Sequence, residues 1–73
     1  MSRFEAVYYP EEDGERLAEW CVVEWTRVNP ETGAKFGKAV WKTLDMETGE
    51  EHAKEMAKIF QFEYNLRFAE EFA

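Results

Sequence analysis

The chain has 73 residues, a formal net charge of −7 and 16% aromatic residues. This length predicts one domain over residues 1–73, and a domain of this size buries only about 60% of the surface that its unfolded chain exposes. The negative charge disfavours binding to nucleic acid or anionic membranes, because neutralising phosphates requires surplus Lys and Arg. The lone cysteine, Cys21, and an N-terminal sequence without a long apolar run lead us to expect a cytoplasmic protein with no membrane contact.

Four segments have the patterns of regular secondary structure. Residues 3–9, 19–28 and 35–44 are rich in aromatic and β-branched residues, which predicts three β-strands. Residues 49–72 contain no proline, and their apolar residues recur every three or four positions, which predicts one helix of about six turns. The order β-β-β-α predicts an α+β fold in which a three-stranded antiparallel sheet packs one face on the long C-terminal helix.

Turn and cap signals define the connections. The segment Asn29-Pro30-Glu31-Thr32-Gly33 suits a hairpin loop built on a type I turn, with Gly33 in the left-handed conformation. This loop predicts a register for the second and third strands, in which the facing pairs are Val22 with Trp41, Val23 with Val40, and Trp25 with Lys38. Ahead of the helix, Thr48 and Glu51 have the spacing of a capping box, in which the Thr48 hydroxyl accepts a hydrogen bond from the Glu51 amide.

Both faces of the predicted hairpin carry large apolar side chains. The face with Trp20, Val22 and Trp41 is expected to pack on the helix, and the small Gly37 leaves room for a close approach. The opposite face then presents rings among cations, and large exposed apolar surfaces usually mark interaction sites. The residues predicted to contact a partner protein there are Trp25, Arg27, Phe36, Lys38 and Lys42. The alternative is a second cover from the chain itself, supplied by the first strand or by residues 10–19.

The predicted helix is also apolar on two sides. A stripe suited to the core is formed by Ala53, Met56, Ala57, Phe60, Tyr64 and Phe68. A second stripe is formed by Ile59, Phe62, Leu66 and Ala69. A three-stranded sheet covers only one stripe, and a helix that is apolar on two sides is buried on two sides. The second stripe is therefore predicted to be a homodimer interface or a site for a different protein.

Residues with catalytic or metal-binding chemistry are few. Cys21 lies among apolar strand residues and His52 in the first helical turns, and these two do not supply the roughly four ligands of a structural zinc site. The sequence has no glycine-rich phosphate loop, no CxxC pair and no nucleophile elbow. We therefore expect a protein without enzymatic activity, metal or cofactor.

The hairpin is a basic region in an acidic chain. Between residues 25 and 43 the cations outnumber a single acid, Glu31, and these cations are Arg27, Lys35, Lys38 and Lys42. Rings interleaved with cations on a sheet are used to bind single-stranded nucleic acid, which gives an alternative function. The simpler interpretation is that lysines on edge strands oppose aggregation. Because four cations on a strongly acidic protein would bind phosphate weakly, nucleic acid is the less favoured partner.

Residues 20–68 combine five features. In chain order these are a strand with Trp20, the Asn-Pro-Glu-Thr-Gly hairpin, Phe36-Gly37, a strand with Trp41, and Thr48-x-x-Glu51 opening an amphipathic helix. This architecture resembles small accessory proteins encoded by bacteriophages and prophages. The resemblance implies a protein that acts in the host cytoplasm by binding alone, as anti-CRISPR and anti-restriction proteins do. We predict a non-enzymatic protein–protein interaction module, with a structural homodimeric subunit as a further alternative.

Overall fold

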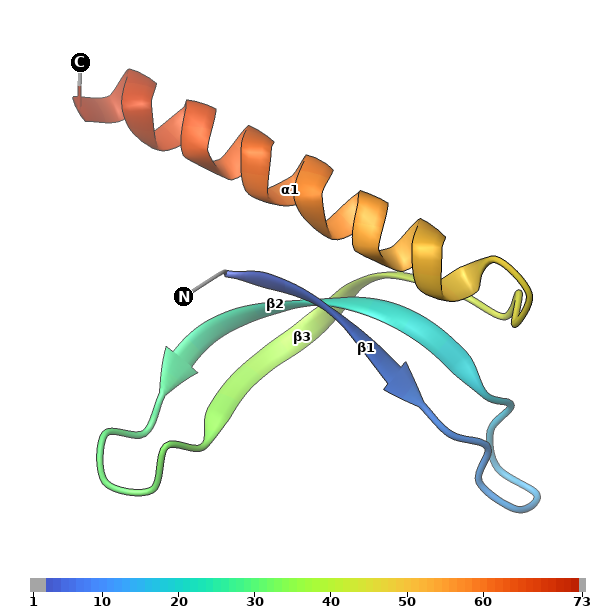
Figure 1. The fold of residues 1–73 in the computed structure, drawn as a ribbon. Helices are drawn as coiled ribbons and strands as arrows, with labels where there is room; N and C mark the ends of the chain where they lie inside the picture. The colour runs from blue at the N-terminus through green and yellow to red at the C-terminus, as the bar shows by residue number, and fades with distance from the viewer. Residues whose placement is uncertain (1–2, 73) are drawn as a thin grey trace.

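The computed structural model describes residues 3–72, with side chains from residue 3 to residue 68, and has the order β-β-β-α (Figure 1). The strands are β1 (Phe4–Tyr9), β2 (Glu19–Val28) and β3 (Lys35–Thr43), and the helix is α1 (Gly49–Phe72). The strands form one antiparallel sheet in the order β1-β2-β3. The expected α+β class is confirmed, and each element begins and ends within one residue of its predicted position.

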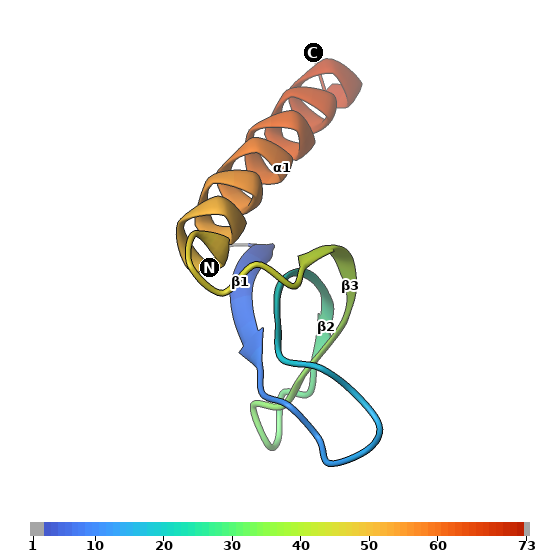
Figure 2. The same ribbon diagram turned by 90° about the vertical axis from the view of Figure 1, so that its right-hand side faces the viewer.

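The helix lies across one face of a strongly curved sheet. Its first turns approach the sheet closely, and its C-terminal turns rise away from the strands in both ribbon views (Figure 1, Figure 2). The resulting molecule is elongated, with extents of 48 × 32 × 16 Å. We call the sheet face that packs on α1 the helix face, and the other side the far face.

The core lies between the helix face and α1. Phe4, Val22 and Ala53 are its buried centre. The ring of Phe4 stacks on Phe60 with a centroid distance of 5.6 Å and meets the edge of Tyr64 at 6.1 Å. The partly buried residues around this centre are Ala6, Trp20, Val40, Trp41, Met56, Ala57, Phe60 and Tyr64. The structure thus confirms that the Trp20, Val22 and Trp41 face packs on the helix, and that the first helical stripe, apart from the exposed Phe68, faces the core.

The register of β2 and β3 differs from the prediction in the middle of the hairpin. Val22 pairs with Trp41 as expected, but the predicted Val23–Val40 and Trp25–Lys38 pairs are wrong. Val23 pairs with Ala39 and Trp25 with Gly37, because the register shifts between Val22 and Val23 and shifts back between Trp25 and Arg27. An extra residue of this kind is a β-bulge, which bends a strand and redirects its side chains. Here it lets both Val40 and Trp41 pack toward the core.

Two glycines occupy positions where backbone and side chains come close. A Cβ at Gly37 would overlap the backbone carbonyl of Glu24, so this glycine accommodates the neighbouring strand β2. The prediction that Gly37 leaves room for the helix is therefore wrong. The close approach of the helix occurs at the buried Gly49, where a Cβ would lie 2.9 Å from the Trp20 ring. Gly49 therefore allows the first turn of α1 to sit directly on the sheet.

The segment before α1 is held by an aspartate, and not by the predicted capping box. The Thr48 hydroxyl donates a hydrogen bond to the Asp45 carboxylate at 2.7 Å, and the Glu47 and Thr48 amides donate to the same carboxylate at 2.9 and 3.2 Å. The hydrogen bond from the Thr48 hydroxyl and those from the two amides hold the pKa of Asp45 below its ordinary value. An Asx turn thus replaces the expected pairing of Thr48 with Glu51.

Candidate interaction surfaces

The second helical stripe is exposed on the side of α1 that faces away from the sheet. The exposed fractions are 44% for Ile59, 64% for Phe62 and 51% for Leu66. At 100° per residue these three positions lie within about 60° of one another and roughly opposite the core stripe. We call them the outer face of α1. Ala69, the fourth residue of the predicted stripe, lies outside the described side chains. The expectation that the sheet covers only one stripe is therefore met at the three described positions.

Charges of both signs border the outer face. Lys58 lies toward one side of it, and Glu63 and Arg67 lie toward the other, whereas Glu55 lies in line with the face, one turn before Ile59, as the helical spacing requires. None of these four side chains forms an ion pair with another described residue, whereas the neighbouring Lys54 pairs with Glu50 at 2.9 Å. The border can therefore contribute ion pairs to a bound partner.

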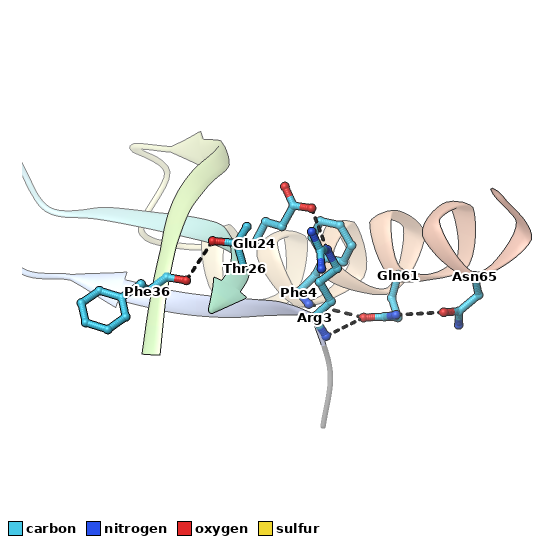
Figure 3. A network of polar contacts seen from close by, with 7 residues as sticks. All are labelled: Arg3, Phe4, Glu24, Thr26, Phe36, Gln61 and Asn65. Carbon is cyan, nitrogen blue, oxygen red and sulfur yellow. Dashed lines mark hydrogen bonds and ion pairs between the residues drawn. The ribbon is translucent and has the colours of Figure 1, made fainter. Parts of the chain in front are cut away.

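A polar network fixes the middle of α1 to the sheet (Figure 3). The Gln61 side-chain oxygen accepts hydrogen bonds from the backbone amides of Arg3 at 2.9 Å and Phe4 at 3.3 Å. The Gln61 amide nitrogen donates to Asn65 at 3.0 Å. These contacts tie the start of β1 to the helix one turn before Leu66, so the outer face is presented on an anchored helix.

Arg3 strengthens the same attachment. Its Nε donates to the Glu24 carboxylate at 2.8 Å (Figure 3). Its guanidinium carbon lies 4.5 Å from the centre of the Tyr64 ring. The hydrogen bond with Glu24 raises the pKa of Arg3 above its ordinary value. The network therefore joins β1, β2 and α1 on the side of the helix that faces the sheet, and it leaves the outer face free.

The predicted hairpin site is divided between the two faces of the sheet. Residues that pair across antiparallel strands share a face. Lys38 pairs with Glu24, which also pairs with the core residue Phe4, so Lys38 projects from the helix face. Lys42 pairs with Cys21, whose neighbour Val22 is in the core, so Lys42 projects from the far face.

The two ring residues of that predicted site are separated in the same way. Trp25 pairs with Gly37, so the next residue along β3, Phe36, points to the opposite face together with its partner Arg27. The five predicted contact residues therefore do not form one patch. Strict alternation could not reveal this, because each of the two register shifts reverses the alternation beyond it.

The rings of the hairpin are already in contact with groups from the chain. The Trp25 indole nitrogen donates to Glu5 at 2.8 Å, and the ammonium of Lys35 lies 5.5 Å from the Trp25 ring. Lys35, and not Lys38 as expected, is thus its cationic neighbour. The Arg27 guanidinium lies 4.9 Å from the centre of the Phe36 ring. The described part of the sheet therefore offers no continuous row of rings on which successive bases could stack.

The far face is partly covered by the chain. Cys21 and Val23 are buried on this side. In the loop between β1 and β2, the Arg16 guanidinium lies 5.4 Å from the centre of the Tyr9 ring and donates to the Pro10 carbonyl at 3.2 Å. Because β1 pairs beside β2 in the same sheet, it does not fold over the far face, and the Arg16 contacts join the loop to the end of β1.

Cys21 and His52, the two residues with potential catalytic chemistry, both contact other residues of the fold. Burial, with a smaller contribution from Glu19, raises the pKa of the Cys21 thiol, which therefore stays protonated at neutral pH. The His52 ring meets the edge of Trp41 at a centroid distance of 4.9 Å. Among the described residues, no three His, Cys, Asp or Glu side chains are grouped so that they could hold a metal ion.

No helix in the described part of the chain has the length and apolar character needed to cross a membrane.

No protein-family model matches the chain, and no curated protein or solved structure matches it either. The exposed surfaces of the molecule are therefore the basis for a functional proposal.

Proposed function

We propose that this protein is a non-catalytic protein–protein interaction module and that the outer face of α1 is its contact surface. The observation that supports this proposal is the alignment of Ile59, Phe62 and Leu66 on the side of the helix away from the sheet, each about half exposed or more. Burying apolar surface contributes roughly 25 cal/mol per Å², so these side chains favour a state in which another protein covers them.

The spacing of the three residues suits recognition of one helix by another protein. Positions 59, 62 and 66 correspond to i, i+3 and i+7, which is the anchor pattern of helices that bind in apolar grooves or against other helices. Because Gln61 and Arg3 hold the helix to the sheet, little backbone order must be gained on binding. Apolar anchors supply affinity in such a contact, and the charges beside them supply orientation.

The ionisable groups with shifted pKa values support a binding function. Arg3, Cys21 and Asp45 each owe their shift mainly to a contact or to burial that stabilises the fold. A catalytic site usually gathers such groups in a cleft, where a nucleophile, a base and an orienting group lie within hydrogen-bond reach. These three residues instead belong to the helix attachment, the buried strand and the loop before the helix.

The proposal extends to the class of accessory proteins that the sequence resembles. A small acidic module of this kind would act by occupying a surface of a host protein. This extension is supported by the sequence resemblance alone, and the genes on either side of the coding sequence test it. Phage genes there would strengthen it, and a metabolic operon would contradict it.

Site-specific crosslinking tests the contact surface. Phe62 is replaced by the photoreactive p-benzoylphenylalanine in the cells that express the protein, and Leu17 carries the same group in the control. The two native side chains are equally exposed, at 64%, but Leu17 lies in the loop between β1 and β2. We expect position 62, and not position 17, to crosslink to protein, including a second copy. Equal yields at both positions, or no crosslink at position 62, would contradict the proposal.

A further inference from the structure

We infer that the protein bound to the outer face of α1 is a second copy of this chain, so that the two helices pack against each other. The inference rests on the proposed function, because it names the partner of the same surface. It follows from the area that the chain leaves exposed, from the local charge of the helix, and from the position of the outer face relative to the sheet.

The exposed area exceeds that of a compact monomer by the amount that one side of a dimer interface buries. The accessible surface of the chain is 5710 Å². A monomer of 8.7 kDa is expected to expose about 4,700 Å², which leaves an excess of roughly 1,000 Å². A standard interface buries about 800 Å² on each partner. The radius of gyration, 14.2 Å, also exceeds the roughly 11 Å expected for a compact domain of this length.

The charge around the outer face suits a second copy better than a strongly charged partner. The chain as a whole carries −7, so two copies repel each other unless their contact region is locally close to neutral. Residues 54–67 meet this condition, because three cations (Lys54, Lys58 and Arg67) accompany two acids (Glu55 and Glu63). The acidic residues that produce the net charge lie elsewhere, chiefly in residues 1–20 and at the two ends of the helix.

Self-complementarity also follows from the free charges. Lys58, Arg67, Glu55 and Glu63 have no ion-pair partner among the described residues. A second copy brings both signs to the interface, so a cation of one copy can pair with an acid of the other. Two-fold contacts use one surface patch in this way on both subunits.

The position of the helix leaves room for the second copy. The outer face lies on the side of α1 away from the sheet, and the C-terminal turns extend beyond the strands (Figure 1, Figure 2). A second helix can therefore lie along Ile59, Phe62 and Leu66 without meeting the sheet. The 3- and 4-residue spacing of these side chains also matches the seam along which paired helices pack.

Sedimentation equilibrium of the full chain tests the inference at concentrations up to about 500 μM, which reveals dissociation constants into the high micromolar range. We expect a mass near twice 8.7 kDa. Leu66→Glu is expected to raise the dissociation constant by about a thousandfold, since each dimer carries the change twice. Leu44→Glu is the matched control, because Leu44 is similarly exposed, at 59%, and lies outside the helix. Its dimer should persist.

Results other than the expected dimer, weakened by Leu66→Glu, contradict the inference. A wild-type monomer at the highest concentration contradicts it directly, and a dimer that survives both Leu66→Glu and Ile59→Glu places the seam elsewhere. Far-UV circular dichroism checks that these variants remain folded. If the chain is a monomer in solution but position 62 crosslinks to a different protein, the partner is not a second copy, and the proposed function still holds. A monomer with no such crosslink would overturn both.

Discussion

Replacing Gly37 by alanine should separate β2 from β3 at the point where the hairpin register is shifted. A Cβ at this position would overlap the carbonyl oxygen of Glu24 and lie 2.9 Å from its carbonyl carbon and 3.0 Å from the Cα of Trp25. All three contacts are with backbone, so the strain cannot be relieved by rotating a flexible side chain. The strands must move apart, and the hydrogen bonds beside the bulge must lengthen.

The expected cost is a large part of the stability of so small a domain. Overpacking of this kind costs about 1–3 kcal/mol, and weakening one ladder hydrogen bond adds about 1 kcal/mol. A total near 3 kcal/mol compares with a free energy of unfolding of roughly 4–11 kcal/mol for a chain of this length. The melting temperature should therefore fall by about 12–24 °C.

Chemical denaturation measures this loss directly. Urea unfolding is followed by tryptophan fluorescence in a Leu66→Glu background, so that self-association does not contribute to the measured free energy. Gly33→Ala is the control, because Gly33 has a φ of 77° but no atom within 4 Å of an added Cβ. Its cost should be only about 1–2 kcal/mol, from backbone strain. If Gly37→Ala loses no more than Gly33→Ala, the close approach does not have the energetic role that we assign to it.

Three further predictions concern the core, the helix start and the buried thiol. Phe4→Ala removes the ring that stacks on Phe60 and should lower the free energy of unfolding by about 3–5 kcal/mol in the same urea assay, and a loss below about 1 kcal/mol would contradict the core assignment. Because the Thr48 hydroxyl helps to hold the folded-state pKa of Asp45 below its unfolded value, Asp45 stabilises the protein above the unfolded pKa, near 3.9, and this contribution disappears as the pH falls through the folded pKa. The melting temperatures of wild type and Asp45→Asn, measured from pH 7 to pH 2, should therefore converge at low pH, and a constant difference would refute this assignment. Since burial raises its pKa, Cys21 should react with a thiol reagent at pH 8 far more slowly in the native protein than in urea, and equal rates would show that the strand is open to solvent.

Much of this protein is determined by local features of its sequence. The strands and the helix follow from short apolar patterns, and the two helical stripes follow from spacings of three and four residues. The hairpin loop follows from its turn residues: the Asn29 amide donates to the Ala34 carbonyl at 2.8 Å, and Gly33 adopts the expected positive φ. Each of these features depends on the conformational preferences of residues close together in the chain, which the sequence displays directly.

Only the tertiary structure decided which side chains of the hairpin share a face. The bulge near Val40 arises because two consecutive residues, Val40 and Trp41, both pack toward α1, and that requirement comes from an element that follows later in the chain. Strict alternation placed Trp25 and Phe36 together, and the bulge separated them. The Asx turn at Asp45 differs in this respect, because its hydrogen bonds span only two or three residues and compete locally with the predicted capping box. Packing between distant segments selects among registers that are locally equivalent, and for this reason the sequence alone could not specify them.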